Sequence, residues 1–137
     1  MRVLFDTNVL LDIIVKREPF LDDSCEALRR AYDLHTPCVS TTTITDIVYI
    51  SKKSFTNAAE QKKILLDFFS DFKICDVKRR QIKKAFDSNM PDFEDAVQAF
   101  CAKQNRVKYI VTRNTKDYAL SPVTAIEPAD FLKMNVK

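Results

Sequence analysis

Acidic side chains follow several segments that read as β-strands, and their positions predict a divalent-metal site. In a parallel α/β sheet, residues that follow strands lie at the carboxyl edge of the sheet, where ligand crevices form. Residues far apart in the sequence can therefore meet there. The acidic residues at such positions are Asp6, Asp46, Asp92, Asp95 and Asp117.

Clustered carboxylates repel one another, and a hard cation that takes oxygen ligands relieves this repulsion. Mg²⁺ and Mn²⁺ have this preference, keep several waters and can bridge a substrate phosphate. The pattern therefore predicts metal-assisted hydrolysis of phosphodiester bonds, with water as the nucleophile and no covalent intermediate.

Each acidic residue also has a structural interpretation. Asp6 could be a turn residue or a helix cap. Asp92 and Asp95 are spaced like an N-cap and the third residue of a helix, and Asp117 could pair with the lysine beside it at the surface. Asp46 lies among apolar neighbours, so we expect it to be largely buried. No Lys or Arg lies within one helical turn of it, so a metal or a distant cation would have to balance its charge.

The elements that position these residues alternate between strand-like and helical apolar spacing. This order predicts one α/β domain over residues 1–137, an α/β/α sandwich around a central, mostly parallel sheet of four to five strands. We expect Pro19 in the first turn of the second helix and threonine caps at Thr41, Thr42 and Thr43. The expected strands are 2–5, 37–40, 72–77, 108–112 and 122–126, and the expected helices are 9–14, 19–35, 44–53, 56–69, 78–88, 92–104 and 128–134.

Composition excludes several classes of protein. The chain has 137 residues, no glycine and one histidine, which argues against glycine-rich phosphate loops and His-centred triads. No apolar run approaches the roughly 20 residues of a membrane span, so we expect a cytoplasmic protein without membrane contact. The four cysteines are widely separated, and we expect them to be buried, reduced thiols.

The formal net charge is +3, and the cations are unevenly distributed. A basic helical stretch around residues 78–84 and cations near the strand 108–112 flank the acidic set. A solvated helix face explains such runs, and contact with RNA phosphates explains them as well. The possible RNA contacts are Lys78, Arg79, Arg80, Arg113 and Lys116.

Four blocks of the sequence, spanning nearly the whole chain, resemble the PIN domain nucleases and, within them, the VapC-type ribonuclease toxins. The blocks are VLFDTNVLLD at 3–12, VSTTTITDI at 39–47, MPDFEDAVQA at 90–99 and YIVTRNTKDY at 109–118. The resemblance implies a central parallel sheet flanked by helices, a Mg²⁺ or Mn²⁺ cofactor, an RNA substrate, a homodimer and an inhibitory antitoxin partner.

The resemblance also assigns roles to individual residues. Asp6 and Asp95 correspond to the principal metal ligands, and Asp46 stands where the family usually has glutamate. Asn114 occupies a position often held by aspartate, with Asp117 as the nearest acidic residue. The implied catalytic set is Asp6, Asp46, Asp95 and Asp117, the metal ligands are Asp6, Asp95, Asp46 and Asp92, and the supporting residues are Asn8, Thr112 and Asn114.

Three functions are compatible with these features. The first is a metal-dependent endoribonuclease that acts as a toxin. The second is a catalytically weak or inactive PIN scaffold that binds RNA or a protein, suggested by Asp46 and Asn114. The third, a phosphatase with Asp6 as nucleophile, is disfavoured because Asn8 occupies the natural place of its second acid.

Overall fold

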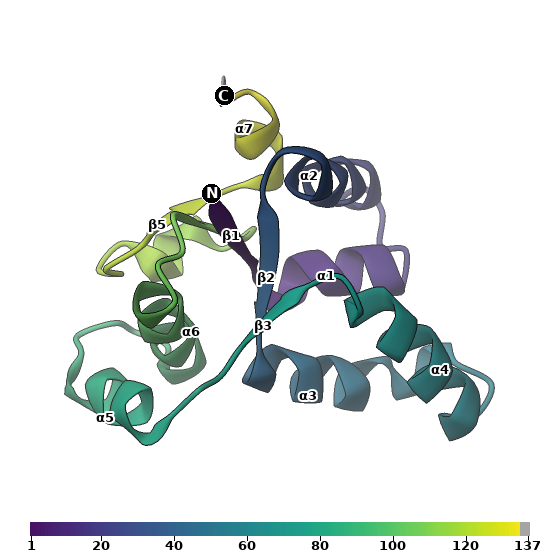
Figure 1. Cartoon of the computed structure of the whole chain (residues 1–137), viewed down its shortest axis with the longest axis horizontal. Coiled ribbons are helices and arrows are strands. Elements are labelled where there is room, and N and C mark those ends of the chain that lie inside the picture. Colours follow the sequence, from purple (N-terminus) through teal and green to yellow (C-terminus); the bar gives the residue numbers. More distant parts are fainter. Residues whose placement is uncertain (135–137) are drawn as a thin grey trace.

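The computed structural model describes residues 1–134, and its centre is a parallel β-sheet (Figure 1). The strands are β1 (Arg2–Phe5), β2 (Thr36–Ser40), β3 (Lys73–Cys75), β4 (Tyr109–Val111) and β5 (Thr124–Ile126). Their order in the 5-stranded sheet is β3-β2-β1-β4-β5, and every neighbouring pair is parallel. The predicted α/β fold is confirmed. Because β1 is the central strand, Asp6, which follows it, lies in the middle of the carboxyl edge of the sheet.

Helices cover both faces of this sheet. In Figure 1, α5 and α6 lie on one side of the sheet, and α1, α2, α3 and α4 lie on the other. This arrangement is the expected α/β/α sandwich. The helices are α1 (Thr7–Ile14), α2 (Leu21–Leu34), α3 (Thr41–Ile50), α4 (Ala58–Phe69), α5 (Arg79–Asp87), α6 (Phe93–Gln104) and α7 (Pro128–Leu132), with short 3₁₀ turns η1 (Ser51–Ser54) and η2 (Thr115–Tyr118).

The core consists of two layers, one on each face of the sheet. Val3 and Phe5 pack into the layer under α1 and α2, whereas Leu4 packs into the layer under α6. Successive side chains of a strand point to opposite faces, and both faces of β1 are covered, so the strand is apolar at Val3, Leu4 and Phe5, after Arg2 at its start. All three side chains are fully buried. The strand that carries Asp6 is therefore held on both sides.

Some element boundaries differ from the prediction. The cap of α3 is Ser40, whose hydroxyl accepts a hydrogen bond from the Thr43 backbone N–H at 3.2 Å, and Thr41 and Thr42 are already helical. No loop separates β2 from α3, so the last strand residue becomes the cap. Pro19 lies in a turn before α2, which begins at Leu21.

The four cysteines are free. Cys38, Cys75 and Cys101 are buried, as expected, but Cys25 is only half-buried because it lies on the outer side of α2. Within residues 1–134, the helices are too short or too polar to cross a membrane.

Candidate functional site

Asp6 links the end of β1 to the start of α1. It is the N-cap of α1, and its Oδ1 accepts a hydrogen bond from the Thr7 backbone N–H at 2.7 Å. The side-chain amide of Asn8 lies 3.3 Å from Asp6 Oδ2 and 3.3 Å from the Thr112 hydroxyl. The cap interpretation of Asp6 is therefore right. A capping role does not exclude a role in a metal site, because Asp6 also lines a cleft at the carboxyl edge of the sheet.

Side chains from distant segments also donate to Asp6. The Gln98 amide donates to Oδ1 at 2.9 Å, and the Thr112 and Tyr118 hydroxyls donate to Oδ2 at 2.8 and 3.3 Å. Asp6 is only 6% exposed, and burial raises the pKa of its carboxyl, although these hydrogen bonds oppose the rise. All of these donors are neutral. The structure therefore orients Asp6 firmly but gives it no positive partner within residues 1–134.

Tyr118 connects Asp6 to Asp95. Its hydroxyl lies 3.3 Å from Asp6 Oδ2 and 3.2 Å from Asp95 Oδ1. A phenol has one proton, so it can donate to only one of the two carboxylates at a time. Burial, followed by the negative charges of Asp6 and Asp92, raises the pKa of Asp95 to about 7. The two carboxylates thus repel each other across a shared hydroxyl, and a cation bound between them would relieve this repulsion.

A cleft of about 530 Å³ contains both carboxylates and two further acidic residues. Asp46 lies on the α3 wall and Glu94 on the α6 wall. Asp46 is half-buried, so the expectation that it is largely buried is wrong: it points from α3 into the open cleft, where water can solvate it. The acidic residues of the lining are Asp6, Asp46, Glu94 and Asp95.

Glu94 is a site residue that the sequence reasoning missed. Burial and the nearby charge of Asp46 raise the pKa of its carboxyl, which places these two side chains close to each other. Its position between Asp92 and Asp95 is the signal that could have revealed it. Only Asp92 and Asp95 have the spacing of a helix cap and its third residue, so Glu94 between them was not considered.

A buried polar network holds the cleft floor, and the sequence reasoning missed this too. The amide oxygen of Gln98 accepts hydrogen bonds from the Ser40 hydroxyl at 2.6 Å and the Thr43 hydroxyl at 3.2 Å. Its amide nitrogen then donates to Asp6. Gln98 is 4% exposed, and its position one turn after Asp95 was the available signal. The network ties β2 and α3 to the carboxylate at the end of β1.

Two predicted acidic residues lie beside the cleft rather than in its lining. Asp92 is the N-cap of α6, and its Oδ1 accepts a hydrogen bond from the Asp95 backbone N–H at 2.9 Å. Asp117 lies on η2, where its charge contributes to the raised pKa of Asp95. Asn114 does line the cleft, and its backbone N–H donates to Thr112 at 3.1 Å.

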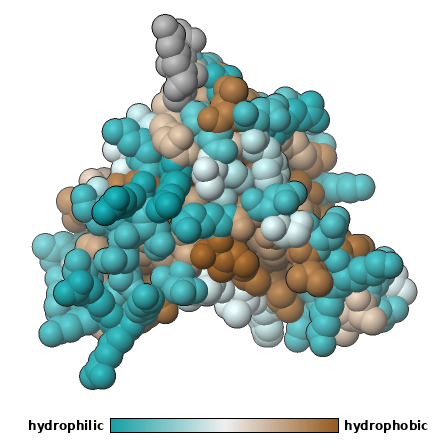
Figure 2. Space-filling model, viewed as in Figure 1, coloured by the Kyte–Doolittle hydropathy of each residue, from teal (hydrophilic) through white to brown (hydrophobic). Residues whose placement is uncertain are grey.

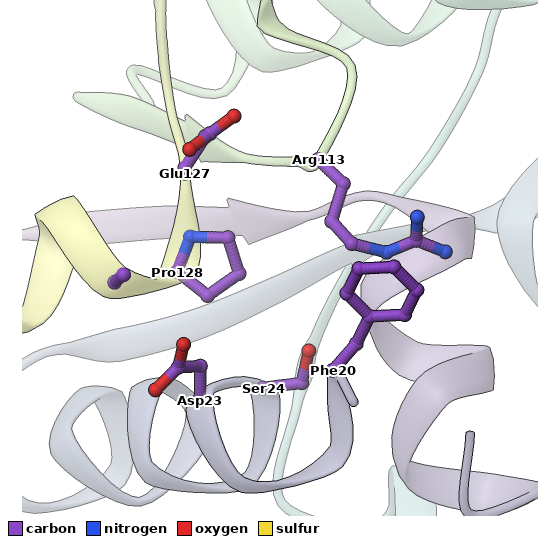
Figure 3. Close-up of a pocket in the computed structure, with 7 residues that line it drawn as sticks. Phe20, Asp23, Ser24, Arg113, Glu127 and Pro128 are labelled. Atoms are coloured by element: carbon purple, nitrogen blue, oxygen red, sulfur yellow. The ribbon is translucent and has the colours of Figure 1, made fainter. Parts of the chain in front are cut away.

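Arg113, a predicted RNA contact, instead forms an ion pair with Asp12. Its Nε donates to Asp12 Oδ2 at 2.8 Å and its Nη2 to Oδ1 at 3.2 Å. The guanidinium lies 3.9 Å from the centre of the Phe20 ring. Figure 3 shows Arg113 over this ring, and both residues line a pocket of about 210 Å³. The other predicted RNA contacts, Lys78, Arg79, Arg80 and Lys116, are exposed and form no ion pair within residues 1–134.

The carboxylates of the cleft are the ligands that a hard cation prefers, although they do not surround one common point. Among residues 1–134, no three Asp, Glu, His or Cys side chains are close enough to form a ready-made metal site. Mg²⁺, however, is commonly held by one or two carboxylates together with waters and substrate phosphate. Asp6 and Asp95 share a hydroxyl and, within the part of the chain that the structure describes, form no ion pair. They fit this mode of binding.

Several solved structures resemble the chain in fold. VapBC2 from Rickettsia felis, bound to a promoter DNA fragment, superimposes with a TM-score of 0.69 at 16% identity, covering 93% of this chain and 98% of that one. A toxin-antitoxin complex from Klebsiella pneumoniae gives 0.70 at 24% identity, covering 92% and 97%. VapC20 from Mycobacterium tuberculosis, a Sarcin-Ricin loop cleaving toxin, gives 0.65 at 10% identity, covering 86% and 94%.

At these identities the superpositions establish the fold alone. A search of curated proteins found no match. The family model for the PIN domain matches residues 2–116, which include both Asp6 and Asp95. This match spans most of the chain, and the chain therefore belongs to the PIN domain family.

Proposed function

We propose that this protein is a Mg²⁺- or Mn²⁺-dependent endoribonuclease that hydrolyses RNA phosphodiester bonds and acts as the toxin of a toxin-antitoxin pair. The observation that carries the proposal is the pairing of Asp6 with Asp95 through Tyr118, in an open cleft and, among the described residues, without an ion pair to either carboxylate. Membership of the PIN family supports it, because PIN proteins are generally nucleases that depend on divalent metals.

Asp6 and Asp95 are the residues that would hold the cation. A bound Mg²⁺ or Mn²⁺ supplies positive charge that offsets the negative charge of the attacked phosphate. Gln98 and Thr112 fix the Asp6 carboxylate, so little reorganisation is required when substrate binds. Asp92 holds the first turn of α6 in place and so positions Asp95.

Asp46 and Glu94 provide the proton-transfer function in this proposal. They lie close together in the cleft lining, and the pKa of Glu94 is raised. A carboxylate with a raised pKa is a better base near neutral pH. We assign this pair the role of accepting a proton from the attacking water.

The substrate and partner assignments rest on the relatives and on surface charge. The structural neighbours include toxin-antitoxin complexes and a toxin described as cleaving the Sarcin-Ricin loop. The exposed cations of α5 provide positive charge for RNA phosphates. We infer an RNA substrate and an antitoxin partner on these grounds. The proposed homodimer rests on the family resemblance alone.

A cleavage assay on defined RNA tests the proposal. Purified wild-type protein should cleave RNA in Mn²⁺ and lose this activity in EDTA. Asp6→Asn and Asp95→Asn should each reduce the rate by roughly 100-fold or more, since even residues that only support metal ligands contribute 10- to 100-fold. Glu26→Gln, in an exposed ion pair with Arg29, is the matched control and should cleave normally. Cleavage that persists unchanged in both site variants would count against the proposal.

A second candidate function, an inactive PIN scaffold that binds RNA or protein, is favoured by one observation. Within residues 1–134 the carboxylates do not form a closed group of three, and the third acid is the shorter Asp46. Calorimetry separates the two functions. Mn²⁺ binding in the millimolar range or weaker, with RNA binding intact, supports the scaffold, whereas tighter binding that Asp95→Asn removes supports the nuclease.

A further inference from the structure

Two phenylalanines form an exposed, tilted pair where α5 meets α6. Phe86 on α5 is 74% exposed and Phe93, the first residue of α6, is 42% exposed. Their ring centroids are 4.6 Å apart, with an angle of 45° between the ring planes. Phe5, Phe69 and Phe72 are buried by contrast. Scattered apolar side chains are ordinary on protein surfaces, but two contacting aromatic rings with exposed faces form a binding surface.

Positive charge lies on the α5 side of this aromatic pair, whereas the acidic residues Asp92 and Glu94 flank it on the α6 side. Arg79, Lys83 and Phe86 are spaced i, i+4 and i+7 along α5, so they share one helix face. Arg79 and Lys83 are exposed, and within residues 1–134 neither forms an ion pair. Figure 2 shows hydrophilic side chains gathered at the lower left, where α5 lies in Figure 1. A second copy of this positive face would be repelled, whereas a polyanion with flat, apolar faces would be attracted.

The aromatic pair is also adjacent to the acidic cleft. Phe93 is followed directly by Glu94 and Asp95, which line that cleft. Residues separated by one or two positions at the start of a helix point in different directions. Because Phe93 and Asp95 are two residues apart, they are only about 3 Å apart along the helix axis. A phosphate at Asp95 therefore leaves a neighbouring base within reach of Phe93 and of Phe86, which contacts it.

We propose that Phe86 and Phe93 form a stacking platform for an unpaired base of single-stranded RNA, next to the phosphate in the acidic cleft. This inference rests on the proposed nuclease function for the role of the cleft, but stacking itself requires no cleavage. Proteins bind single strands by combining aromatic platforms with cationic grooves. Bases in a duplex are stacked on each other and cannot reach the rings, so the platform selects unpaired segments.

Binding measured without cleavage tests the platform. Fluorescence anisotropy in EDTA compares a short RNA that contains one 2-aminopurine with the fully paired duplex of the same sequence. Phe86→Ala should weaken single-strand binding by roughly 5- to 150-fold, the range for one lost base–aromatic stack, and leave duplex binding unchanged. Phe86→Tyr should retain the affinity. Leu66→Ala, which removes another exposed apolar side chain on α4, is the matched control.

Two further readouts separate stacking from charge. Wild-type protein should quench 2-aminopurine on binding, and Phe86→Ala should abolish the quenching. Lys83→Gln should keep the quenching but reduce the slope of log affinity against log salt by about 0.7, the value for one phosphate contact on a single strand.

The proposal is overturned if wild-type protein binds no single-stranded RNA in EDTA, if Phe86→Ala binds it normally, or if this variant loses single-strand and duplex binding equally. It is also overturned if sedimentation shows that Phe86→Ala converts a dimer to a monomer, because the rings then form a contact between protein chains. Cleavage of the same RNA in Mn²⁺ is scored separately. A wild-type protein that stacks bases but does not cleave contradicts the nuclease alone, and one that cleaves but does not stack contradicts the platform alone.

Discussion

Asp6 and Asp12 are both buried, one at the start of α1 and one in its last turn, but only Asp12 has a cationic partner among residues 1–134. Asp12 is fully buried and paired with Arg113, which donates to both of its carboxylate oxygens, while the Ser24 hydroxyl donates from 3.2 Å. Asp6 is almost as buried, but it receives hydrogen bonds only from neutral groups and has another carboxylate, Asp95, across a shared hydroxyl.

The difference separates a structural acid, Asp12, from Asp6, for which we propose a functional role. A buried charge is normally balanced by a partner inside the protein, and Asp12 has one. Around Asp6 and Asp95 the fold supplies orientation, but neither carboxylate forms an ion pair within residues 1–134. Arg17 lines the same cleft, and its guanidinium lies 4.0 Å from Asp12 instead. This imbalance is typical of a site whose counter-charge comes from solution.

The largest expected effect is on stability and concerns Asp12, the aspartate paired with Arg113. Asp12→Ala leaves Arg113 without its partner and should lower the free energy of unfolding by about 3–5 kcal/mol, as for other broken buried pairs. Urea denaturation measures the change. Glu26→Ala, which breaks the exposed pair with Arg29, should change it by less than about 1 kcal/mol. Equal effects of the two variants would remove the distinction drawn between the two aspartates.

The next effect concerns the unbalanced acids. Mn²⁺ at 100 times its dissociation constant should stabilise wild-type protein by about 2.7 kcal/mol and raise its thermal midpoint, whereas Asp6→Asn and Asp95→Asn should show no such rise. Asp92→Asn should respond like wild type, because asparagine is an equally good N-cap. Loss of the response in Asp92→Asn would instead identify Asp92 as a metal ligand.

A smaller effect is expected from pH in the absence of metal. The folded-state pKa of Asp95, about 7, lies above its ordinary value of 3.8, so the folded protein binds the proton more tightly than the unfolded chain. Stability should therefore be highest below about pH 4 as far as Asp95 is concerned, and should decline as pH rises to about 7. Asp95→Asn should remove this decline and, at pH 8, stabilise the metal-free protein on the order of 1 kcal/mol, a figure reduced for the partial exposure of this side chain. Thermal unfolding across pH 4–8 checks this, and an unchanged pH profile in the variant would contradict it.

The smallest effect is expected at Tyr118. Its hydrogen bond lowers the pKa of Asp95 against the larger influences that raise it. Tyr118→Phe should therefore raise the pKa of Asp95 further, while the buried ring keeps its packing. Carboxyl NMR titration of metal-free protein measures the shift, with Tyr109→Phe as the control ring. A downward shift would show that the hydroxyl does not stabilise the charged form of Asp95.

The sequence alone determined the order of strands and helices and the positions of the acids. Apolar spacing is a local property, so β1, β2 and β4 were located closely, and Asp6 and Asp95 could be placed at the carboxyl edge. The bounds of short elements were predicted less accurately. The strand expected at 72–77 covers only Lys73–Cys75, because a brief apolar run does not show where hydrogen bonding to the neighbouring strand stops.

Only the tertiary structure decided which side chains meet. The sheet order places β4 beside β1, and this adjacency brings Thr112 and Tyr118 to Asp6 and diverts Arg113 to Asp12. The depth of Asp46, the inclusion of Glu94 and the anchoring by Gln98 likewise depend on how α3 and α6 pack across the sheet. Periodicity is read within one segment, whereas hydrogen bonds and charge pairs between distant segments arise only once the chain is folded.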